Sequence, residues 1–360
     1  MNTAEAQAFS AGHTPILPAR APQLGFHSER LLVIDPLTRR FGDYSIAELP
    51  RLLEPGDALV VNDAATLPAS LRVDRELELR LVSRESDGSF RAVAFGAGDF
   101  RQPTETRGAP RPLGVGNTLT FGPELTATIV DVDAAEPRLL RIRFLATDAA
   151  LWQALYRYGR PIQYAYANQP LQLWDVQNRY AARPWAFELP SAGRPLTFEL
   201  LFQLERRGAS LAHVTHAASI SSTGSDSLDR RLPLAERYEI GEQAARVIAR
   251  ARAEGGRVIA AGTSVVRALE GRAAADGTVR AGSGETELRL SQRYSPRVVD
   301  GLLTGLHEPG TSHFDLLEAF APRPLLLRAV EHAARTGYLQ HEFGDSCLVL
   351  AGALLERLAV

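Results

Sequence analysis

The segment from Gly256 to Glu270, GRVIAAGTSVVRALE, constrains the fold more than any other part of the sequence. Its short apolar run follows a Gly-Gly break and is typical of a buried strand. The Gly-Thr-Ser that comes next indicates a tight turn, and the remainder begins a helix. Thr263 or Ser264 is a suitable N-cap for that helix, because a hydroxyl can accept a hydrogen bond from an unpaired helix N–H group. The segment therefore predicts a strand, a turn and a helix of an α/β fold.

The same turn is a candidate anion site. Backbone N–H groups are unpaired at a helix start, and the helix dipole is positive there, so a carboxylate or phosphate binds favourably. Arg267, one turn into the helix, can add a charge-assisted hydrogen bond to the same anion. An ordinary capped helix is the alternative interpretation of this segment taken alone.

Period-2 alternation of apolar and polar residues is confined to one region of the chain. The alternating or β-rich segments are residues 75–84, 89–95, 117–121, 125–131 and 139–144. Such a series of short strands is typical of a small all-β module. Outside it, apolar strands alternate with helices, which predicts an α/β body. We therefore expect an α/β main domain formed by residues 1–69 and 147–360, with a barrel-like all-β domain inserted at residues 70–146.

Within the α/β body, the pattern predicts buried strands and amphipathic helices at definite places. We expect strands at 30–35, 57–61, 257–261 and 346–350, and helices at 196–206, 240–253, 316–320 and 325–335. Residues 150–195 have weak periodicity and predict a long, partly helical, irregular segment. Residues 214–227, rich in Ser and Thr, predict a polar loop.

The composition excludes several classes of enzyme. The chain has no lysine, so all 40 of its Lys and Arg residues are arginine. Schiff-base chemistry with pyridoxal phosphate and Walker-type nucleotide hydrolysis both need a lysine and are therefore excluded. One cysteine, Cys347, excludes an internal disulfide and a cysteine-rich metal site. The net charge of −2 gives no overall attraction to nucleic acid, so an RNA partner would need a local arginine patch.

The chain also has no feature of a membrane or secreted protein. Its N-terminus lacks the basic start and apolar core of a signal peptide, and no apolar run is long enough to span a bilayer. We expect a cytoplasmic protein with no membrane contact and no bound metal. We expect it to be a monomer or a weak homo-oligomer.

Polar residues that could carry chemistry follow predicted strands or lie in loops. Asn62 and Asp63 end a strand, where ligand sites of α/β proteins usually lie. His307 lies in a Gly/Pro-rich loop and could serve as a general acid or base near neutral pH. A surface-loop histidine is the alternative interpretation. Asp345 precedes the last strand and is suited to a turn or cap.

Taken together, these segments resemble the S-adenosylmethionine:tRNA ribosyltransferase-isomerases of queuosine biosynthesis. The matching blocks are RLLVID, LEPGDALVVNDAATLPASL, PSAG, LTFELL, GGRVIAAGTSVVRALE, VVDGLLTGLHEPGTS and FGDSCLVL. The resemblance implies an α/β domain with an inserted β-barrel. It also implies that the ribosyl unit of S-adenosylmethionine is moved onto a 7-aminomethyl-7-deazaguanine in tRNA, with release of adenine and methionine and formation of an epoxycyclopentane. S-adenosylmethionine would be a cosubstrate.

The resemblance and the chemistry together suggest roles for particular residues. A sulfonium acidifies the neighbouring C5′ hydrogens, so a positioned base can remove one, and adenine needs an acid or hydrogen-bond donor to leave. For this catalysis the candidates are His307, Glu236 and Asp63. For binding of S-adenosylmethionine the candidates are Asn62, Thr263, Ser264, Arg267, Glu270 and Asp345.

Three histidines of the family pattern are missing or displaced. The family's His-x-Gly-x-Gly-Thr-Phe block falls on THAASISST, with His216 as its displaced histidine, and the Met-His-x-Glu block has Leu234 in place of its histidine. The Pro-Thr-Ala-Gly-Leu-His block ends in Pro195 instead of its histidine. Two alternatives therefore stay open. One is a divergent enzyme that uses the sulfonium on a small molecule, and the other is a non-catalytic protein that binds S-adenosylmethionine or RNA.

Overall fold

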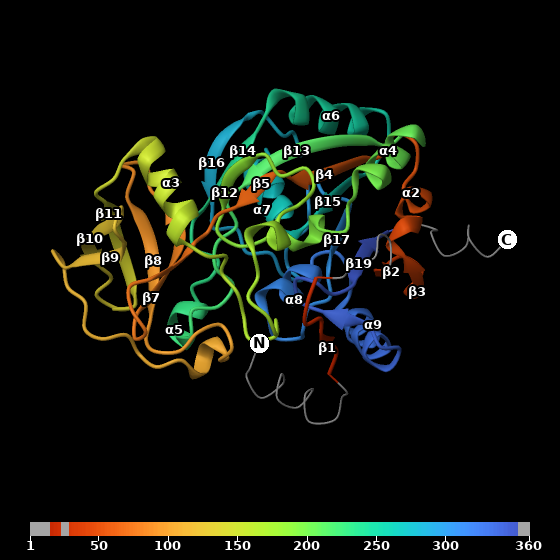
Figure 1. Cartoon of the computed structure of the whole chain (residues 1–360). Helices are drawn as coiled ribbons and strands as arrows, with labels where there is room; N and C mark the ends of the chain where they lie inside the picture. The colour runs from red at the N-terminus through yellow and green to blue at the C-terminus, as the bar shows by residue number, and fades with distance from the viewer. Residues whose placement is uncertain (1–14, 23–28, 352–360) are drawn as a thin grey trace.

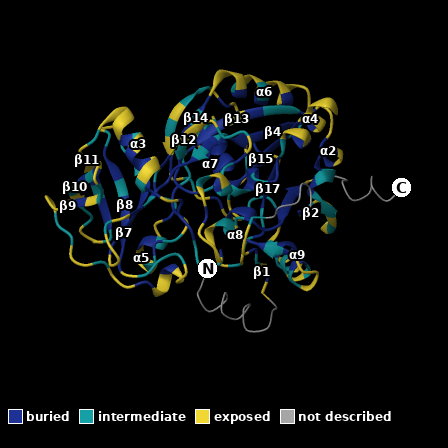
Figure 2. Ribbon diagram, viewed as in Figure 1, coloured by how far each residue is buried: buried dark blue, intermediate teal, exposed yellow. Residues whose placement is uncertain are grey.

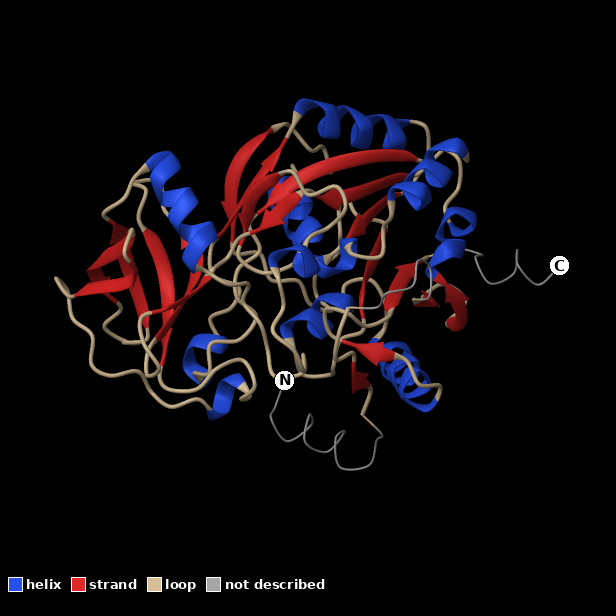
Figure 3. Ribbon diagram, in the orientation of Figure 1, coloured by secondary structure: helices blue, strands red, loops and turns tan. Residues whose placement is uncertain are grey.

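The computed structural model describes residues 15–22 and 29–351. It contains a large mixed sheet flanked by helices, and beside it a smaller antiparallel sheet next to which α3 (Asp148–Tyr158) and α5 (Asp226–Asp229) lie (Figures 1 and 3). The predicted fold class, an α/β body with an inserted barrel-like β module, is confirmed. The predicted division into two domains, with its boundaries at residues 69 and 147, stays a prediction.

The main sheet has nine strands in the order β16-β14-β13-β4-β15-β17-β19-β2-β3. Their bounds are β16 Gly282–Thr286, β14 Glu236–Ile240, β13 Ser210–His216, β4 Ala58–Asn62, β15 Val258–Ala261, β17 Gly301–Gly305, β19 Ser346–Leu350, β2 Arg30–Asp35 and β3 Arg40–Ser45. The four strands β13, β4, β15 and β17 are parallel neighbours, with Val61 opposite Ala261 and Ala261 opposite Leu303. The carboxyl ends of these four strands therefore lie side by side.

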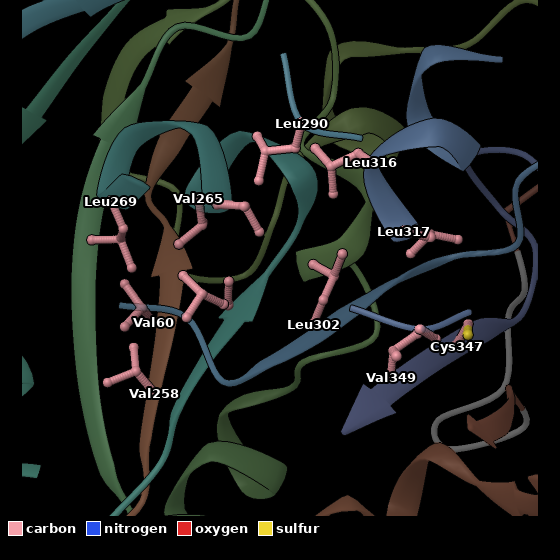
Figure 4. Packing of buried hydrophobic residues seen from close by; sticks show 14 of the residues in the cluster. Val60, Val258, Val265, Leu269, Leu290, Leu302, Leu316, Leu317, Cys347 and Val349 are labelled. Atoms are coloured by element: carbon pink, nitrogen blue, oxygen red, sulfur yellow. The ribbon is translucent and has the colours of Figure 1, made fainter. Parts of the chain in front are cut away.

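Alternate residues of the central strands bury their side chains on opposite faces of the sheet. On one face, residues such as Leu32 and Val60 pack against four helices: α6 (Glu242–Ala253), α7 (Thr263–Arg272), α8 (Ser312–Leu317) and α9 (Arg323–Arg335). Figure 4 shows part of this core, with Val265 and Leu269 of α7 above Val60 and Val258. On the other face, Leu59 and its neighbours pack against α2 (Leu49–Leu52) and α4 (Phe198–Arg206). The central strands are buried throughout, whereas the outer side of α6 is exposed (Figure 2).

The inserted sheet has six antiparallel strands in the order β6-β7-β8-β11-β10-β9. Their bounds are β6 Ser70–Arg72, β7 Glu78–Arg84, β8 Phe90–Phe95, β11 Leu139–Phe144, β10 Leu125–Val132 and β9 Thr118–Gly122. The sheet is nearly closed, and α3 (Asp148–Tyr158) contributes Leu151 and Leu155 to its apolar interior.

Short elements connect the two sheets or pair at their margins. They are β1 Leu17–Pro18 with β18 Leu339–Gln340, β5 Ala64–Thr66 with β12 Arg183–Ala186, α5 Asp226–Asp229, and the 3₁₀ turns η1 Ile46–Glu48, η2 Thr104–Thr106, η3 Leu173–Val176 and η4 Ser191–Gly193. Residues 159–195 are largely irregular, as their weak periodicity predicts.

Two local predictions are wrong. The segment 214–227 is not a continuous loop, because its first three residues belong to β13 and α5 lies near its end. The neighbouring strands β4 and β14 pair with this polar stretch and hold it extended, which its composition did not indicate. The helix expected at 316–320 instead begins at Ser312, where Thr311 caps it by accepting a hydrogen bond from the Phe314 N–H at 3.2 Å. Among the described helices, none is long and apolar enough to cross a membrane.

Candidate active site

A pocket lies where the carboxyl ends of β15 and β17 meet the first turn of α7. Its wall includes five of the residues singled out in the sequence: Glu236, Thr263, Ser264, Arg267 and His307. It continues into a wider cavity, and His307, His313 and Glu342 line both.

The first turn of α7 presents hydrogen-bond donors to this pocket. Gly262 precedes the helix with a φ of 106°, a left-handed conformation that a glycine adopts at little cost. Its N–H is bonded to the Leu303 carbonyl oxygen, and its own carbonyl accepts from Val265. The N–H groups of Thr263 and Ser264 have no partner within the helix, since the first turn lacks preceding carbonyls. The predicted side-chain cap is wrong, because neither hydroxyl caps the helix and Gly262 is the N-cap.

Arg267 and Glu236 form a buried ion pair in the wall of the pocket. The Arg267 Nε donates to Glu236 Oε2 at 2.7 Å, and the backbone N–H of Ser219 donates to Glu236 Oε1 at 3.0 Å. Burial alone would raise the pKa of Glu236, but the Arg267 charge and the other contacts outweigh burial and lower it. Glu236 is therefore an ionised carboxylate that orients the guanidinium.

His216, at the end of β13, lies behind this pair. Its Nε2 is 3.3 Å from Glu236 Oε2, although neither ring nitrogen makes a geometrically acceptable hydrogen bond within the described chain. Burial lowers the pKa of His216 to about 4; the Glu236 charge opposes this shift and the Arg267 charge adds to it. His216 is therefore a neutral side chain that fills the space behind Glu236.

His307 faces both parts of the connected space. Its Nε2 lies 2.8 Å from Thr304 Oγ1, and its ring stacks on that of His313 with centroids 5.1 Å apart. Burial lowers the pKa of His307 well below its ordinary value, with the nearby histidines adding to the effect. Burial likewise lowers the pKa of His313 to about 4. At neutral pH both rings are therefore uncharged.

Two carboxylates in this space were not among the candidate residues that the sequence suggested. Glu342 lines both cavities, and burial raises its pKa to about 7, against the effect of a hydrogen bond with Tyr166. Glu188 accepts hydrogen bonds from the hydroxyl of Tyr164 and from the backbone N–H of Ser221, the latter at 3.0 Å, and burial raises its pKa too. Both glutamates come from irregular segments next to the PSAG and FGD blocks, and that proximity was the only available signal.

The four remaining candidate residues do not line the pocket. Asn62 is buried and holds two strand ends together: its Oδ1 accepts from the His216 and Ala64 N–H groups, and its Nδ2 donates to the His216 carbonyl. Asp63 accepts a hydrogen bond from Thr215 Oγ1 at 2.6 Å. Both residues therefore fix the junction of β4 and β13, next to the pocket and not within its wall.

Glu270 and Asp345 also bind backbone instead of facing the pocket. Glu270 is fully buried and accepts hydrogen bonds from three successive backbone N–H groups, those of residues 297–299. Asp345 accepts from the N–H groups of Arg30 and Leu339, both at 2.8 Å, so it anchors the chain before β19. The turn or cap role considered for Asp345 agrees with these contacts. In the described part of the chain, no three His, Cys, Asp or Glu side chains are grouped as a metal site.

Comparison with known proteins places this chain in a family. The sequence profile of the family described as "Queuosine biosynthesis protein" matches residues 13–349. The S-adenosylmethionine:tRNA ribosyltransferase-isomerase of Rhodospirillum rubrum is 33% identical over 92% of this chain and 94% of that protein. The protein of the same name from Acidiphilium cryptum is 35% identical over 92% of this chain and 95% of its own length.

A solved structure has a similar fold. The crystal structure of an S-adenosylmethionine tRNA ribosyltransferase from Thermotoga maritima superposes with a TM-score of 0.50 and 23% identity, over 93% of this chain and 96% of that chain. The resemblance that the sequence blocks from RLLVID to FGDSCLVL indicate is thus matched by a family profile and by relatives aligned over most of their length. The chain belongs to the queuosine biosynthesis protein family.

Proposed function

We propose that this protein is an S-adenosylmethionine:tRNA ribosyltransferase-isomerase. It transfers the ribosyl unit of S-adenosylmethionine to a 7-aminomethyl-7-deazaguanine base of tRNA and rearranges that unit, so that epoxyqueuosine forms and adenine and methionine are released. The observation that carries the proposal is the family match over residues 13–349. We further propose that it acts in the cytoplasm, without a metal, as a monomer or a weak homo-oligomer.

In this proposal the methionine end of S-adenosylmethionine lies against the first turn of α7. The N–H groups of Thr263 and Ser264 and the positive end of the helix dipole supply donors and charge for its carboxylate. Arg267 adds a guanidinium, which Glu236 holds in place at 2.7 Å. Asn62, Asp63, Glu270 and Asp345 act indirectly, because they fix the strands and loops from which these groups project.

Proton transfer in this proposal uses two groups whose environments separate their pKa values, a pattern typical of acid–base pairs. His307 is neutral and can accept the C5′ proton that the sulfonium acidifies. Glu342, with a pKa of about 7, is partly protonated near neutral pH and can donate a proton to the departing adenine. Glu236, which the sequence suggested as a proton-transfer residue, serves to orient Arg267, because the guanidinium keeps it ionised.

Replacing Arg267 with alanine should weaken binding of S-adenosylmethionine by about 1.5–3 kcal/mol, the range for a hydrogen bond to a charged group. Titration calorimetry measures this directly. Arg272→Ala is the matched control, since Arg272 lies on the same helix and donates to backbone carbonyls of Arg280 and Ala281. Equal affinity of the Arg267→Ala variant and the parent would contradict the proposed carboxylate site.

The rate of adenine release should fall as pH rises through about 7, because Glu342 loses its proton there. The sign follows from the raised pKa: the protonated, donating form is present below that pH and is lost above it. In the Glu342→Gln variant this fall should disappear and the rate at pH 6 should be lower than in the parent. A variant with the parent's pH profile would assign the proton donor to another group.

One incubation separates the proposal from its alternatives. The protein is mixed with S-adenosylmethionine alone, with the free base 7-aminomethyl-7-deazaguanine, or with tRNA that carries this base, and adenine and methionine are measured. Release that requires the tRNA supports the proposal. Release with the free base alone would indicate a small-molecule enzyme, and binding without any release would indicate a non-catalytic protein.

A further inference from the structure

A cleft separate from the pocket lies between the inserted sheet and the main sheet. It is lined by Trp152 of α3, Trp185 of β12, Phe187, Arg84 at the end of β7, and Arg237 of β14. Successive residues of a strand point to opposite sides, so Arg237 faces this cleft whereas Glu236 faces the pocket. The cleft and the pocket thus lie on opposite faces of strand β14.

The two tryptophan rings of the cleft are half-buried, and arginine side chains lie over both: Arg84 over Trp152, and Arg237 and Arg183 over Trp185. The Cζ of Arg237 is 3.9 Å from the centre of the Trp185 ring, and the Cζ of Arg84 is 5.5 Å from that of Trp152. The floor between them is apolar, with Leu67 and Phe187 buried. The cleft therefore offers flat aromatic faces together with cationic groups.

The charge of these two arginines is not neutralised by a carboxylate. Neighbouring arginines are paired: Arg91 lies 3.0 Å from Glu85 and Arg183 lies 2.6 Å from Glu239. Among the described residues, neither Arg84 nor Arg237 has an acidic oxygen within 4.0 Å.

Two carboxylates line the cleft: Glu85, which pairs with Arg91, and Glu285. Glu285 lies opposite Arg237 in the pairing of β14 with β16, yet it too stays outside ion-pair distance. Both guanidiniums are exposed and so are available to an anionic ligand. This is a local cationic site on a chain whose net charge is −2.

We propose that this cleft binds an unpaired nucleotide of the RNA substrate, outside the pocket where the reaction takes place. Nucleobases exposed in single-stranded RNA stack on aromatic side chains, and guanidiniums bind the phosphates beside them. An RNA partner of a protein without net positive charge needs such a local arginine site. The inference rests on the proposed function, because it assumes that the acceptor is an RNA.

The tryptophans give a direct measurement of this binding. The chain has three, and the third, Trp174, lies outside the cleft with 75% of its surface exposed. In a Trp174→Phe background the remaining tryptophan fluorescence comes from the cleft alone. Titration with an unmodified RNA hairpin that has a single-stranded loop should quench this fluorescence, and a fully paired RNA of the same length should not.

Variants of the cleft should weaken binding of the hairpin without affecting the chemistry. Trp185→Ala should reduce affinity roughly 5- to 150-fold, the range for loss of one stacked base. Arg84→Ala combined with Arg237→Ala should also reduce it, because two phosphate-binding charges are lost. The arginine variant should also show a weaker dependence on salt. The matched control is Arg157→Ala, an exposed arginine on α3 paired with Glu124 at 2.7 Å, and its affinity should be unchanged.

The outcomes distinguish this inference from the proposed function. With substrate tRNA, the cleft variants should raise KM and leave kcat for adenine release as in the parent. If the parent turns over tRNA while the variants bind the hairpin as tightly as the parent does, the cleft is not an RNA site and the proposed function stands. Quenching by the paired RNA equal to that by the hairpin would also overturn the inference. If the parent releases no adenine with any RNA, the proposed function fails, whatever the hairpin titration gives.

Discussion

Replacing His307 with alanine is expected to slow adenine release by about 10²–10⁴-fold, the usual contribution of a general acid or base. The imidazole lies 2.8 Å from Thr304 and lines both connected cavities, a position consistent with the proton transfer proposed for it. The variant should stay folded and bind S-adenosylmethionine with nearly the affinity of the parent. Single-turnover measurement of adenine, with S-adenosylmethionine and tRNA both saturating, isolates this step.

A second histidine variant serves as the control for this experiment. His332 lies on α9, away from the pocket, where its Nε2 is 2.9 Å from Asp43. His332→Ala should turn over like the parent. If His307→Ala also remained within about twofold of the parent, far below the expected range, His307 would have a structural role.

Replacing Glu236 with glutamine is expected to lower the free energy of unfolding by about 3–5 kcal/mol, since removing one partner of a buried ion pair leaves the other charge uncompensated. Arg267 would keep its charge in a site where it is only 8% exposed. Glutamine has nearly the same volume and can still accept a hydrogen bond from the Ser219 N–H. The decrease in the free energy of unfolding therefore measures loss of the negative charge and not a change in side-chain shape. Urea unfolding, monitored by circular dichroism, measures the change.

An exposed pair provides the comparison for this variant. Glu254 pairs with Arg250 at 2.8 Å on the outer surface of α6, where the two side chains are 53% and 76% exposed. Glu254→Gln should change stability by no more than about 1 kcal/mol, as is usual for surface pairs. A Glu236→Gln variant as stable as Glu254→Gln would contradict the buried ion pair.

Stability should also depend on pH in the direction that the Glu236 pKa sets. The pKa of this carboxyl is lower in the folded chain than its ordinary value of 4.5. The stabilisation is therefore present above that value and is lost as pH falls through the folded pKa. The parent should thus lose more stability on acidification below pH 4.5 than the Glu236→Gln variant does.

Much of the fold could be predicted because its signals are local. The apolar run before Gly262 and the helix after it gave β15 and α7, and period-2 alternation located the inserted sheet. The errors arose where distant contacts override local preference. Thr215 and His216 are polar, yet pairing with β14 makes them part of a strand. The cap of α7 was assigned to a hydroxyl, whereas the left-handed φ of Gly262 turns the chain so that no side-chain cap is used.

The candidate site was less accessible to sequence reasoning. Motif resemblance identified the blocks that meet at the pocket, and Thr263, Arg267 and His307 do line it. It did not indicate which residues of a block face the pocket, so Glu270, which binds the backbone of residues 297–299, was grouped with them. Glu342 has neither periodicity nor motif spacing to mark it. Its raised pKa depends on burial by segments far away in the sequence.

The ribosyl carbons of S-adenosylmethionine are expected to end in the RNA. The most direct test uses S-adenosylmethionine labelled with ¹³C in its ribose and tRNA that carries 7-aminomethyl-7-deazaguanine, followed by mass spectrometry of the digested RNA. The expected result is a modified nucleoside that carries all the labelled ribose carbons, in an amount equal to the adenine released. Adenine release with no label in the RNA would contradict the claim, since the ribosyl unit would then have gone to another acceptor or to water.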